Sequence, residues 1–251
     1  MNYVWLYAHG ESAWRKIGLF NELEYSIRSV QKNAPPGRYF VVGDKPEVSM
    51  DVTWIDSPRV AMGDHPHSRG HLDKQAKFRK IINSPEIGED IVIMCDDIFI
   101  LKPQTEEDLK INWAKTEVTY IPDYLRSEMR TGTVPYKQNW KATYDFIFMI
   151  RAGNRKKTYD WETHTPRFVE KSKFKDMLER YDFTTNPMFP ISVYDGLYAE
   201  NSQIMPEGMQ ADLWSHTLGM DFDPYFECTY MHIYDNIIVP EFVQKMKEMF
   251  G

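Results

Sequence analysis

Short apolar runs alternate with amphipathic segments along the first hundred residues of the chain. In chain order, the pattern predicts a strand at 4–8, a helix at 21–32, strands at 38–42 and 52–55, a helix at 72–83 and a strand at 90–94. The last of these strands is apolar after its first residue, as is typical of a strand buried on both faces of a parallel sheet. We therefore expect an α/β fold in which helices flank a mostly parallel, Rossmann-like central sheet.

The second half of the chain is richer in helical patterns, which occur at 138–151, 166–181 and 240–250. No internal repeat or long linker separates the two halves. We expect a single domain over residues 1–251, with a sheet-forming half to about residue 105 and a helix-rich half from about residue 106.

Composition and charge exclude some classes of partner. The formal net charge is −7, so bulk electrostatics do not favour a polyanion. No stretch approaches the roughly 18 apolar residues of a membrane span, and the two cysteines, Cys95 and Cys228, lack metal-ligand spacing. These features predict a cytoplasmic protein with no membrane partner, and no protein partner is evident. Aromatic residues make up 14% and suit sugar or base binding, although a large aromatic core is the commoner explanation.

Cys95 separates the strand predicted at 90–94 from the acidic pair Asp96-Asp97. In open parallel sheets, ligands bind beyond the carboxyl ends of the strands. Two adjacent carboxylates repel each other unless a cation, a proton or a basic side chain compensates their charge. Mg²⁺ or Mn²⁺, held by carboxylates and by the phosphates of a donor, meets this need. A turn or a helix cap is the structural alternative for the same residues.

Four segments resemble parts of the Stealth-type sugar-phosphate transferases and related phage glycosyltransferases. They lie in the same order between about residues 4 and 170. They are the helix Asn21-Glu22-Leu23-Glu24-Tyr25-Ser26-Ile27-Arg28-Ser29-Val30 after a loop containing Gly10-Glu11-Ser12, then Val41-Val42-Gly43-Asp44-Lys45-Pro46, Met94-Cys95-Asp96-Asp97-Ile98-Phe99-Ile100 and Glu162-Thr163-His164-Thr165-Pro166. The first is the most specific, because the similarity runs through consecutive residues of one helix. The last eighty or so residues show little similarity.

The resemblance implies a variant of the GT-A nucleotide-sugar transferase fold, in which an acidic motif holds Mn²⁺ or Mg²⁺ against a donor diphosphate. It implies Asp97 as a metal ligand, and Asp96 as a further ligand or a contact to the donor sugar or ribose. His232 resembles the late histidine that completes the metal shell in many such enzymes. Because Cys95 replaces the first carboxylate of an Asp-x-Asp motif, either Asp96 or Asp97 could be the main ligand.

The same resemblance places further residues around the donor and acceptor. Gly10, Ser12, Glu22, Arg28 and Asp44 are implied donor contacts; a helix start, a surface ion pair and a plain turn are the alternatives for the last three. His164 is implied as a catalytic contact to donor or acceptor. Asp195, among aromatic residues, is a candidate general base, and a helix cap is its alternative.

Two basic segments are candidates for binding phosphates. Lys74 and Lys77 follow a cluster of His65, His67 and His71 and could lie over the donor phosphates; a solvated cationic face and a zinc site are the alternatives. Arg155-Lys156-Lys157, with aromatic residues in the segment 140–161, suggests a DNA strand as partner. A solvated basic loop explains this second segment as well.

Together, these features predict a metal-dependent glycosyltransferase that moves a sugar from a nucleotide sugar, with a UDP-sugar expected, to an acceptor hydroxyl. The acceptor would be a hydroxymethylated DNA base, presented outside the duplex stack, or a bacterial surface glycan. In this interpretation the nucleotide sugar binds the half up to about residue 105, and the acceptor binds the other half. Sugar-1-phosphate transfer and a non-catalytic nucleotide-sugar-binding module are the alternatives.

Overall fold

The computed structural model describes residues 1–9, 18, 20–60, 71–119, 135–152, 157–186, 188–214, 220–234 and 237–251. Its strands are β1 (Asn2–Tyr7), β2 (Arg38–Gly43), β3 (Thr53–Asp56), β4 (Asp90–Met94), β5 (Ile98–Ile100), β6 (Trp113–Ala114), β7 (Arg167–Glu170), β8 (Gln203–Ile204), β9 (Gln210–Leu213) and β10 (Tyr230–Ile233). Its helices are α2 (Glu22–Asn33), α3 (His71–Asn83), α4 (Glu106–Leu109), α6 (Pro135–Ala152), α7 (Lys171–Arg180), α8 (Pro190–Tyr198), α9 (Asp223–Phe226) and α10 (Pro240–Phe250).

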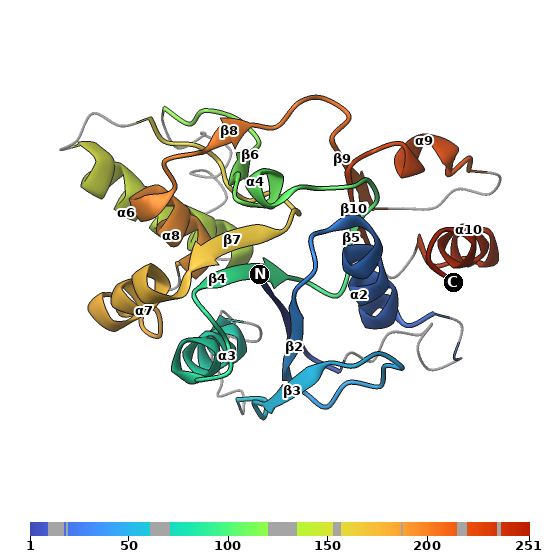
Figure 1. The fold of residues 1–251 in the computed structure, drawn as a ribbon. Helices are drawn as coiled ribbons and strands as arrows, with labels where there is room; N and C mark the ends of the chain where they lie inside the picture. The colour runs from blue at the N-terminus through green and yellow to red at the C-terminus, as the bar shows by residue number, and fades with distance from the viewer. Residues whose placement is uncertain are drawn as a thin grey trace.

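A five-stranded sheet of order β3-β2-β1-β4-β7 forms the centre of the molecule (Figure 1). β1, β2, β3 and β4 are parallel, and β7 pairs with β4 in the antiparallel direction. The chain runs outward from β1 to β3 and then returns to place β4 on the other side of β1. The strand order therefore reverses between β1 and β4, and the carboxyl ends of these two strands define the point where open α/β sheets bind ligands.

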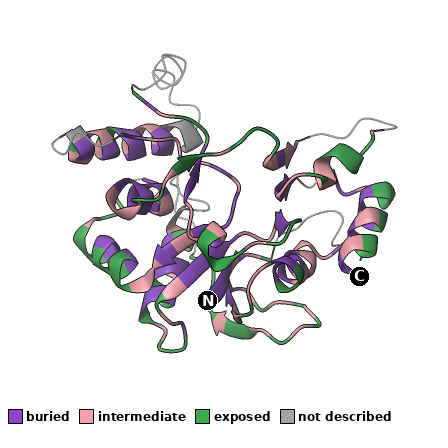
Figure 2. Cartoon of the chain, turned by 45° about the horizontal axis from the view of Figure 1, so that its top comes forward, coloured by how far each residue is buried: buried purple, intermediate pink, exposed green. Residues whose placement is uncertain are grey.

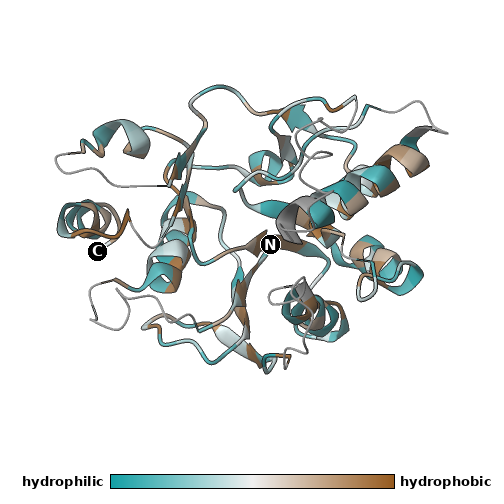
Figure 3. Ribbon diagram, turned by 180° about the vertical axis from the view of Figure 1, so that it is seen from behind, coloured by the Kyte–Doolittle hydropathy of each residue, from teal (hydrophilic) through white to brown (hydrophobic). Residues whose placement is uncertain are grey.

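Both faces of the central sheet are covered, as the sequence predicted. Along β1, Val4 packs into a core with α3, α7 and α8, whereas the neighbouring residues Tyr3 and Trp5 pack on the opposite face against α2. The side chains of a strand alternate between faces, so an entirely apolar strand requires two covering layers. β1, β2 and β4 are accordingly mostly buried, whereas the edge strand β3 is mostly exposed (Figure 2), and hydrophobic residues gather on the central strands in Figure 3.

A second, three-stranded sheet of order β5-β10-β9 joins the acidic segment to the C-terminal part of the chain. β10 pairs antiparallel with β5 and parallel with β9, and α10 packs against this sheet through a separate apolar core. α2 fastens β5 from the other side, because Ser29 Oγ accepts from the amide of Ile100 at 3.0 Å and Asn33 donates to its carbonyl at 2.8 Å. A short pair, β6 and β8, completes the strands described.

Gly43 brings the carboxyl ends of β1 and β2 together. Its φ is +136°, a conformation that favours glycine, and a Cβ at this position would lie 1.9 Å from the carbonyl oxygen of Tyr7. The following residue, Asp44, accepts a hydrogen bond from the amide of His9 at 2.6 Å. The strand end that carries Asp44 is thus held beside the end of β1.

One predicted element is wrong. The segment 166–181 was expected to be a single helix, but Arg167–Glu170 forms β7 and only Lys171–Arg180 forms α7. The apolar residues of both parts fit a helical spacing, so periodicity alone did not separate them. Pairing with β4 decides the outcome, since Val169 opposite Ile91 extends the central sheet.

The structure tests only the coarser part of the fold-class prediction, and the GT-A-like assignment stays a prediction. The mostly parallel central sheet with flanking helices is confirmed. Across the ranges that the structure describes, no helix combines the length and the apolar character needed to cross a bilayer.

Candidate metal-dependent active site

The acidic segment forms a tight turn between β4 and β5, at the carboxyl edge of the central sheet. Ser26 of α2 fastens this turn, because its hydroxyl contacts the carbonyl oxygens of Cys95 at 3.3 Å and Ile98 at 2.6 Å. Trp5 of β1 donates in turn to the Ser26 hydroxyl at 2.9 Å. The conformation of the acidic turn is therefore fixed by buried polar contacts from the first strand and the first described helix.

Cys95 is not equipped to act as a metal ligand in this turn. Burial, together with the nearby charge of Asp97, raises the pKa of its thiol to about 12. Metal ions bind the thiolate rather than the thiol. The carboxylates of the turn remain its candidate ligands.

Asp97 contacts His232, although 135 residues separate the two in the sequence. Their contact joins Asp97 Oδ2 to His232 Nε2 at 3.2 Å, and the amide of Ile233 donates to the carbonyl of Asp97 at 3.1 Å. His232 lies on β10 and is 4% exposed. The two residues that the resemblance implied as metal ligands are thus brought together by the pairing of β5 with β10.

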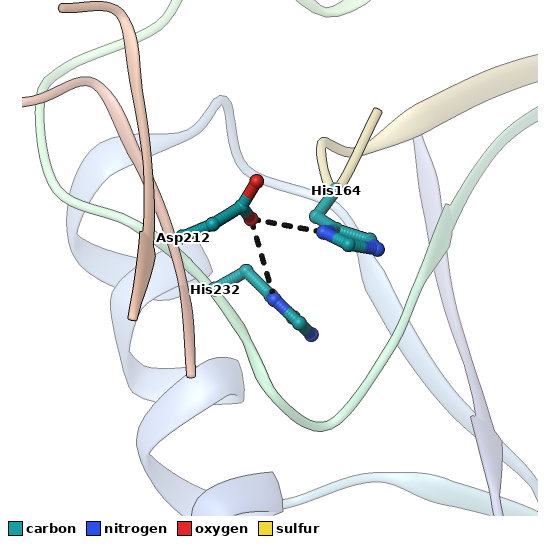
Figure 4. Close-up of side chains that lie close together, drawn as sticks. All are labelled: His164, Asp212 and His232. Atoms are coloured by element: carbon teal, nitrogen blue, oxygen red, sulfur yellow. Dashed lines mark hydrogen bonds and ion pairs between the residues drawn. The ribbon is translucent and has the colours of Figure 1, made fainter. Parts of the chain in front are cut away.

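Two more side chains complete what we call the His–Asp cluster, which consists of Asp97, His164, Asp212 and His232. Figure 4 shows the last three of these residues. His164 Nδ1 lies 2.9 Å from Asp212 Oδ1, and its ring stacks on that of His232 with centroids 3.9 Å apart. His232 Nδ1 lies 3.3 Å from the same Asp212 oxygen. His232 therefore presents one nitrogen to each of the two carboxylates.

Asp212 is the anionic centre of this cluster. Its Oδ1 also accepts from Gln210 Nε2 at 2.8 Å, so three side chains converge on one oxygen. Burial alone would raise the pKa of Asp212, but the hydrogen bonds from His164 and His232 hold it well below its usual range. Asp212 is consequently ionised at neutral pH.

The same contacts shift the pKa of His232 in the opposite direction. Burial alone would lower the pKa of its imidazole, but its contacts with Asp212 and Asp97 outweigh burial and raise it to about 9. The positive charge on the protonated His232 imidazole partly compensates the two carboxylates. A cation at this position would have to replace that proton.

The cluster fits a divalent cation. Asp97 and the Nε2 atom of His232 provide one oxygen and one nitrogen ligand, which suits Mn²⁺, Fe²⁺ or Zn²⁺ better than Mg²⁺, a cation that prefers oxygen. A second set is formed by His164, Asp212 and His232, whose ligand atoms lie within 4.8 Å of one another. Because Asp212 Oδ1 is already shared by three donors, a cation there would displace existing hydrogen bonds.

We predict that binding of Mn²⁺ releases about one proton and becomes stronger as the pH rises towards 9. His232 is protonated below its raised pKa of about 9, and a metal ligand must be deprotonated. Apparent affinity should therefore rise about tenfold per pH unit between pH 7 and 8.5. Isothermal titration calorimetry in buffers of different ionisation enthalpy measures both quantities. Binding that is independent of pH and releases no proton would show that His232 is not a ligand.

The carboxylate of Asp195 is not exposed to solvent and therefore cannot contact an acceptor. Its carboxylate on α8 is fully buried and forms an ion pair with Arg167 of β7, which is 7% exposed. A general base has to contact the acceptor hydroxyl, and a buried ion pair leaves no room for that contact. The structure therefore favours a structural role for Asp195 over the predicted catalytic one.

Arg28 is likewise engaged in structural contacts. Its guanidinium pairs with Glu24 one turn earlier on α2, at 2.8 Å, and donates to the carbonyl of Phe250 at 3.0 Å. This is the surface ion pair that was the alternative to a phosphate clamp. Glu22 is the first residue of α2, half-buried, and its role as a donor contact stays a prediction.

Asp44 follows β2, and Lys77 of α3 lies beside Gly43 at the end of that strand, whereas Lys74 of the same helix is exposed. Burial alone would raise the pKa of Asp44, but the His9 amide and the Arg59 guanidinium hold it below its usual value. Lys77 is 2% exposed and ion-paired with Asp73, and its Cε lies 2.8 Å from a Cβ built on Gly43. Contact of these residues with a donor stays a prediction.

The remaining predicted residues divide into two groups. Gly10, Ser12, His65 and His67 lie outside the described residues, as does the side chain of His71. Asp96 is half-buried in the acidic turn, where its role is untested.

The described residues of the predicted DNA-binding segment 140–161 lack the exposed aromatic side chains that DNA binding would require. Trp140, Tyr144 and Trp161 are at most 8% exposed and belong to an apolar core with α6. Arg151 is also buried and donates to carbonyl oxygens, and Lys157 pairs with Glu117 at 2.7 Å. These rings are not available for stacking on bases. Residues 153–156 lie outside the described part.

Asp212 is the member of the cluster that sequence reasoning missed. It stands in no recognisable motif, within the segment Gln210-Ala211-Asp212-Leu213-Trp214. A signal was nevertheless present, since this segment and Tyr230-Met231-His232-Ile233-Tyr234 share an alternation that places Asp212 and His232 at equivalent positions of two strands.

No protein-family model and no curated protein matches the chain. The function is therefore inferred from the four side chains of the His–Asp cluster and from the strand ends that carry them.

Proposed function

We propose that the protein is a metal-dependent glycosyltransferase of GT-A-like architecture that uses a nucleotide sugar as donor. The observation that carries this proposal is the contact between Asp97 and His232 beside the point where the strand order reverses. A carboxylate after a buried parallel strand and a late histidine are the two metal ligands implied by the resemblance. Their 3.2 Å separation, across 135 residues of sequence, supports that assignment.

Asp97 and His232 Nε2 hold the cation in this proposal, and the donor diphosphate fills the rest of its shell. When bound, the cation would stabilise the negative charge that develops on the departing diphosphate. Asp212 orients His232 through Nδ1, as carboxylates do for metal-bound histidines in general. Two protein ligands alone make a weak metal site, so donor and metal should bind cooperatively.

His164 takes the place of Asp195 as the candidate general base. Its Nδ1 faces Asp212, which fixes the ring, and the side chain is 33% exposed. If Nδ1 carries the proton, Nε2 is free to accept one from an acceptor hydroxyl. The acceptor itself, a glycan or a hydroxymethylated DNA base, is left to experiment. The buried aromatic residues of 140–161 give no support to the DNA base.

Sugar-1-phosphate transfer is the second candidate, because His164 belongs to the segment that resembles the Stealth-type transferases and lies inside the cluster. The two reactions break different bonds. Glycosyl transfer releases a nucleoside diphosphate, whereas transfer of a sugar phosphate releases a nucleoside monophosphate. Chromatography of the nucleotide products separates them.

The first test is thermal stabilisation by a panel of nucleotide sugars with and without Mn²⁺. We expect a matching donor with Mn²⁺ to raise the melting temperature, and each component alone to have a smaller effect, because ligands that bind the native state stabilise it. Donor hydrolysis should follow the same preference. If no nucleotide sugar shifts the melting temperature with any divalent metal, the proposal is wrong. Stabilisation without any turnover of donor would instead indicate a binding module.

A further inference from the structure

β9 and β10 carry two successive layers of functional side chains on one face. The parallel register pairs Asp212 with His232 and Leu213 with Ile233, and the amide of Tyr234 donates to the carbonyl of Leu213 at 3.2 Å. Side chains two residues apart on a strand lie on the same face. Trp214 and Tyr234 therefore follow Asp212 and His232 on the face of the His–Asp cluster, while Leu213 and Ile233 enter the opposite apolar core.

The second layer is an aromatic stack that begins at the cluster and ends at the surface. Tyr234 meets His232 edge to face with ring centroids 4.6 Å apart, and Trp214 stacks on Tyr234 at 4.2 Å. Trp214 is also 6.4 Å from the ring of His164. It is nevertheless 59% exposed, one of the most exposed large apolar side chains that the structure describes. A tryptophan side chain is seldom this exposed, and here it lies beside a cluster of polar side chains.

We propose that Trp214, supported by Tyr234, is the platform on which the glycosyl ring of the donor stacks. The apolar C–H face of a pyranose packs well on a flat π-face, and the rings of Trp214 and Tyr234 are held in place by the stack itself. The inference rests on the proposed function, because a cation held by Asp97 and His232 fixes the diphosphate. The glycosyl ring is bonded to that diphosphate and so lies within about one ring width of the cluster.

A sugar ring fits this platform better than the other flat or apolar ligands. The nucleobase of the donor is at the far end of its diphosphate, away from the cation. The cation at Asp97 is already shared with the donor diphosphate, so the further phosphates of a nucleic-acid strand would lie uncompensated near the carboxylates of Asp97 and Asp212. A neutral pyranose carries no such charge, and its hydroxyl groups can face the cluster while its C–H face covers Trp214.

The test compares the binding of matched pairs, such as UDP and UDP-glucose, with Mn²⁺ present, for wild type and Trp214→Ala. Calorimetry should show that Trp214→Ala weakens the nucleotide sugar about tenfold and leaves the nucleoside diphosphate within about twofold. That change corresponds to roughly 1.4 kcal/mol of lost stacking. Trp214→Phe should retain most of the affinity, whereas Trp214→Leu, which keeps apolar bulk without a ring, should lose it. Met149→Ala, at an exposed apolar side chain of α6, is the surface control.

The outcomes separate this inference from the proposed function. If wild type binds neither member of any nucleotide pair, the proposed function fails and the platform with it. If wild type binds both members but Trp214→Ala weakens them equally, or weakens neither, the platform alone is wrong. Unchanged donor binding together with weaker binding of a free pyranoside acceptor or of a single-stranded oligonucleotide would also overturn it, since Trp214 would then serve the acceptor.

Discussion

Donor turnover is expected to fall by about 10²- to 10³-fold when Asp97 is replaced by Asn. The amide keeps the size of the side chain but removes the charge that faces His232 Nε2 at 3.2 Å. Stabilisation of a departing diphosphate by a metal contributes several kcal/mol, and each 1.4 kcal/mol or so is a factor of ten in rate. Initial rates of donor hydrolysis, measured at saturating Mn²⁺, test this expectation.

Two further variants make the Asp97→Asn result specific. Asp212→Asn should reduce metal affinity by about 10- to 100-fold, the effect typical of a carboxylate that orients a metal-bound histidine. Asp145→Asn should change nothing, because this exposed aspartate of α6 forms a local ion pair with Lys141, one turn away on the same helix. If Asp212→Asn abolishes metal binding and Asp97→Asn does not, the cation is held by His164, Asp212 and His232 instead.

The second large effect is on stability, and we expect it from Asp195→Asn. Burial lowers the pKa of Arg167 to about 10 against the opposing effect of Glu162, so its guanidinium is still charged at pH 7, and Asp195 is its buried ion-pair partner. Removing one partner of a buried pair costs about 3–5 kcal/mol, because the other charge is left uncompensated. For a chain of this size, the melting temperature should fall by on the order of 10 °C.

The same variant separates the structural role of Asp195 from the catalytic one. At a temperature well below its melting transition, Asp195→Asn should retain most of the donor turnover of wild type. A stable Asp195→Asn protein that has lost at least about a hundredfold in activity would restore Asp195 as the general base. The exposed variant Asp145→Asn again serves as the control, with an expected change in stability within about 0.5 kcal/mol.

The sequence was sufficient for the parts of the fold that depend on local pattern. The four parallel strands, α2, α3 and α10 follow from apolar runs, helical spacing and turn residues, and their bounds agree within a few residues. It also identified Asp97, His164 and His232, which the structure brings into one cluster. The strand β7 was missed because its four residues are defined by pairing with β4 rather than by their own periodicity.

Partner choice was the part that local pattern did not determine. Arg28 binds the carbonyl of Phe250, which is 222 residues away, and Asp195 binds Arg167 through the packing of α8 against β7. Asp212 joins the cluster only because β9 and β10 pair in one particular register. A charged side chain acquires its role from the groups that desolvate and neutralise it, and those groups are set by tertiary structure.

The pairing of β10 with β5 also sets an order of events during folding. The parallel core from β1 to β4 is built from the first hundred residues, but the Asp97 ligand pair is incomplete until Tyr230–Ile233 docks against Ile98–Ile100. Contacts of such long sequence separation form late, because loop closure must come first. A nascent chain that has not yet been extended to residues 230–233 therefore lacks one of the two proposed ligands, so capture of the cation has to follow synthesis of the C-terminal part of the chain.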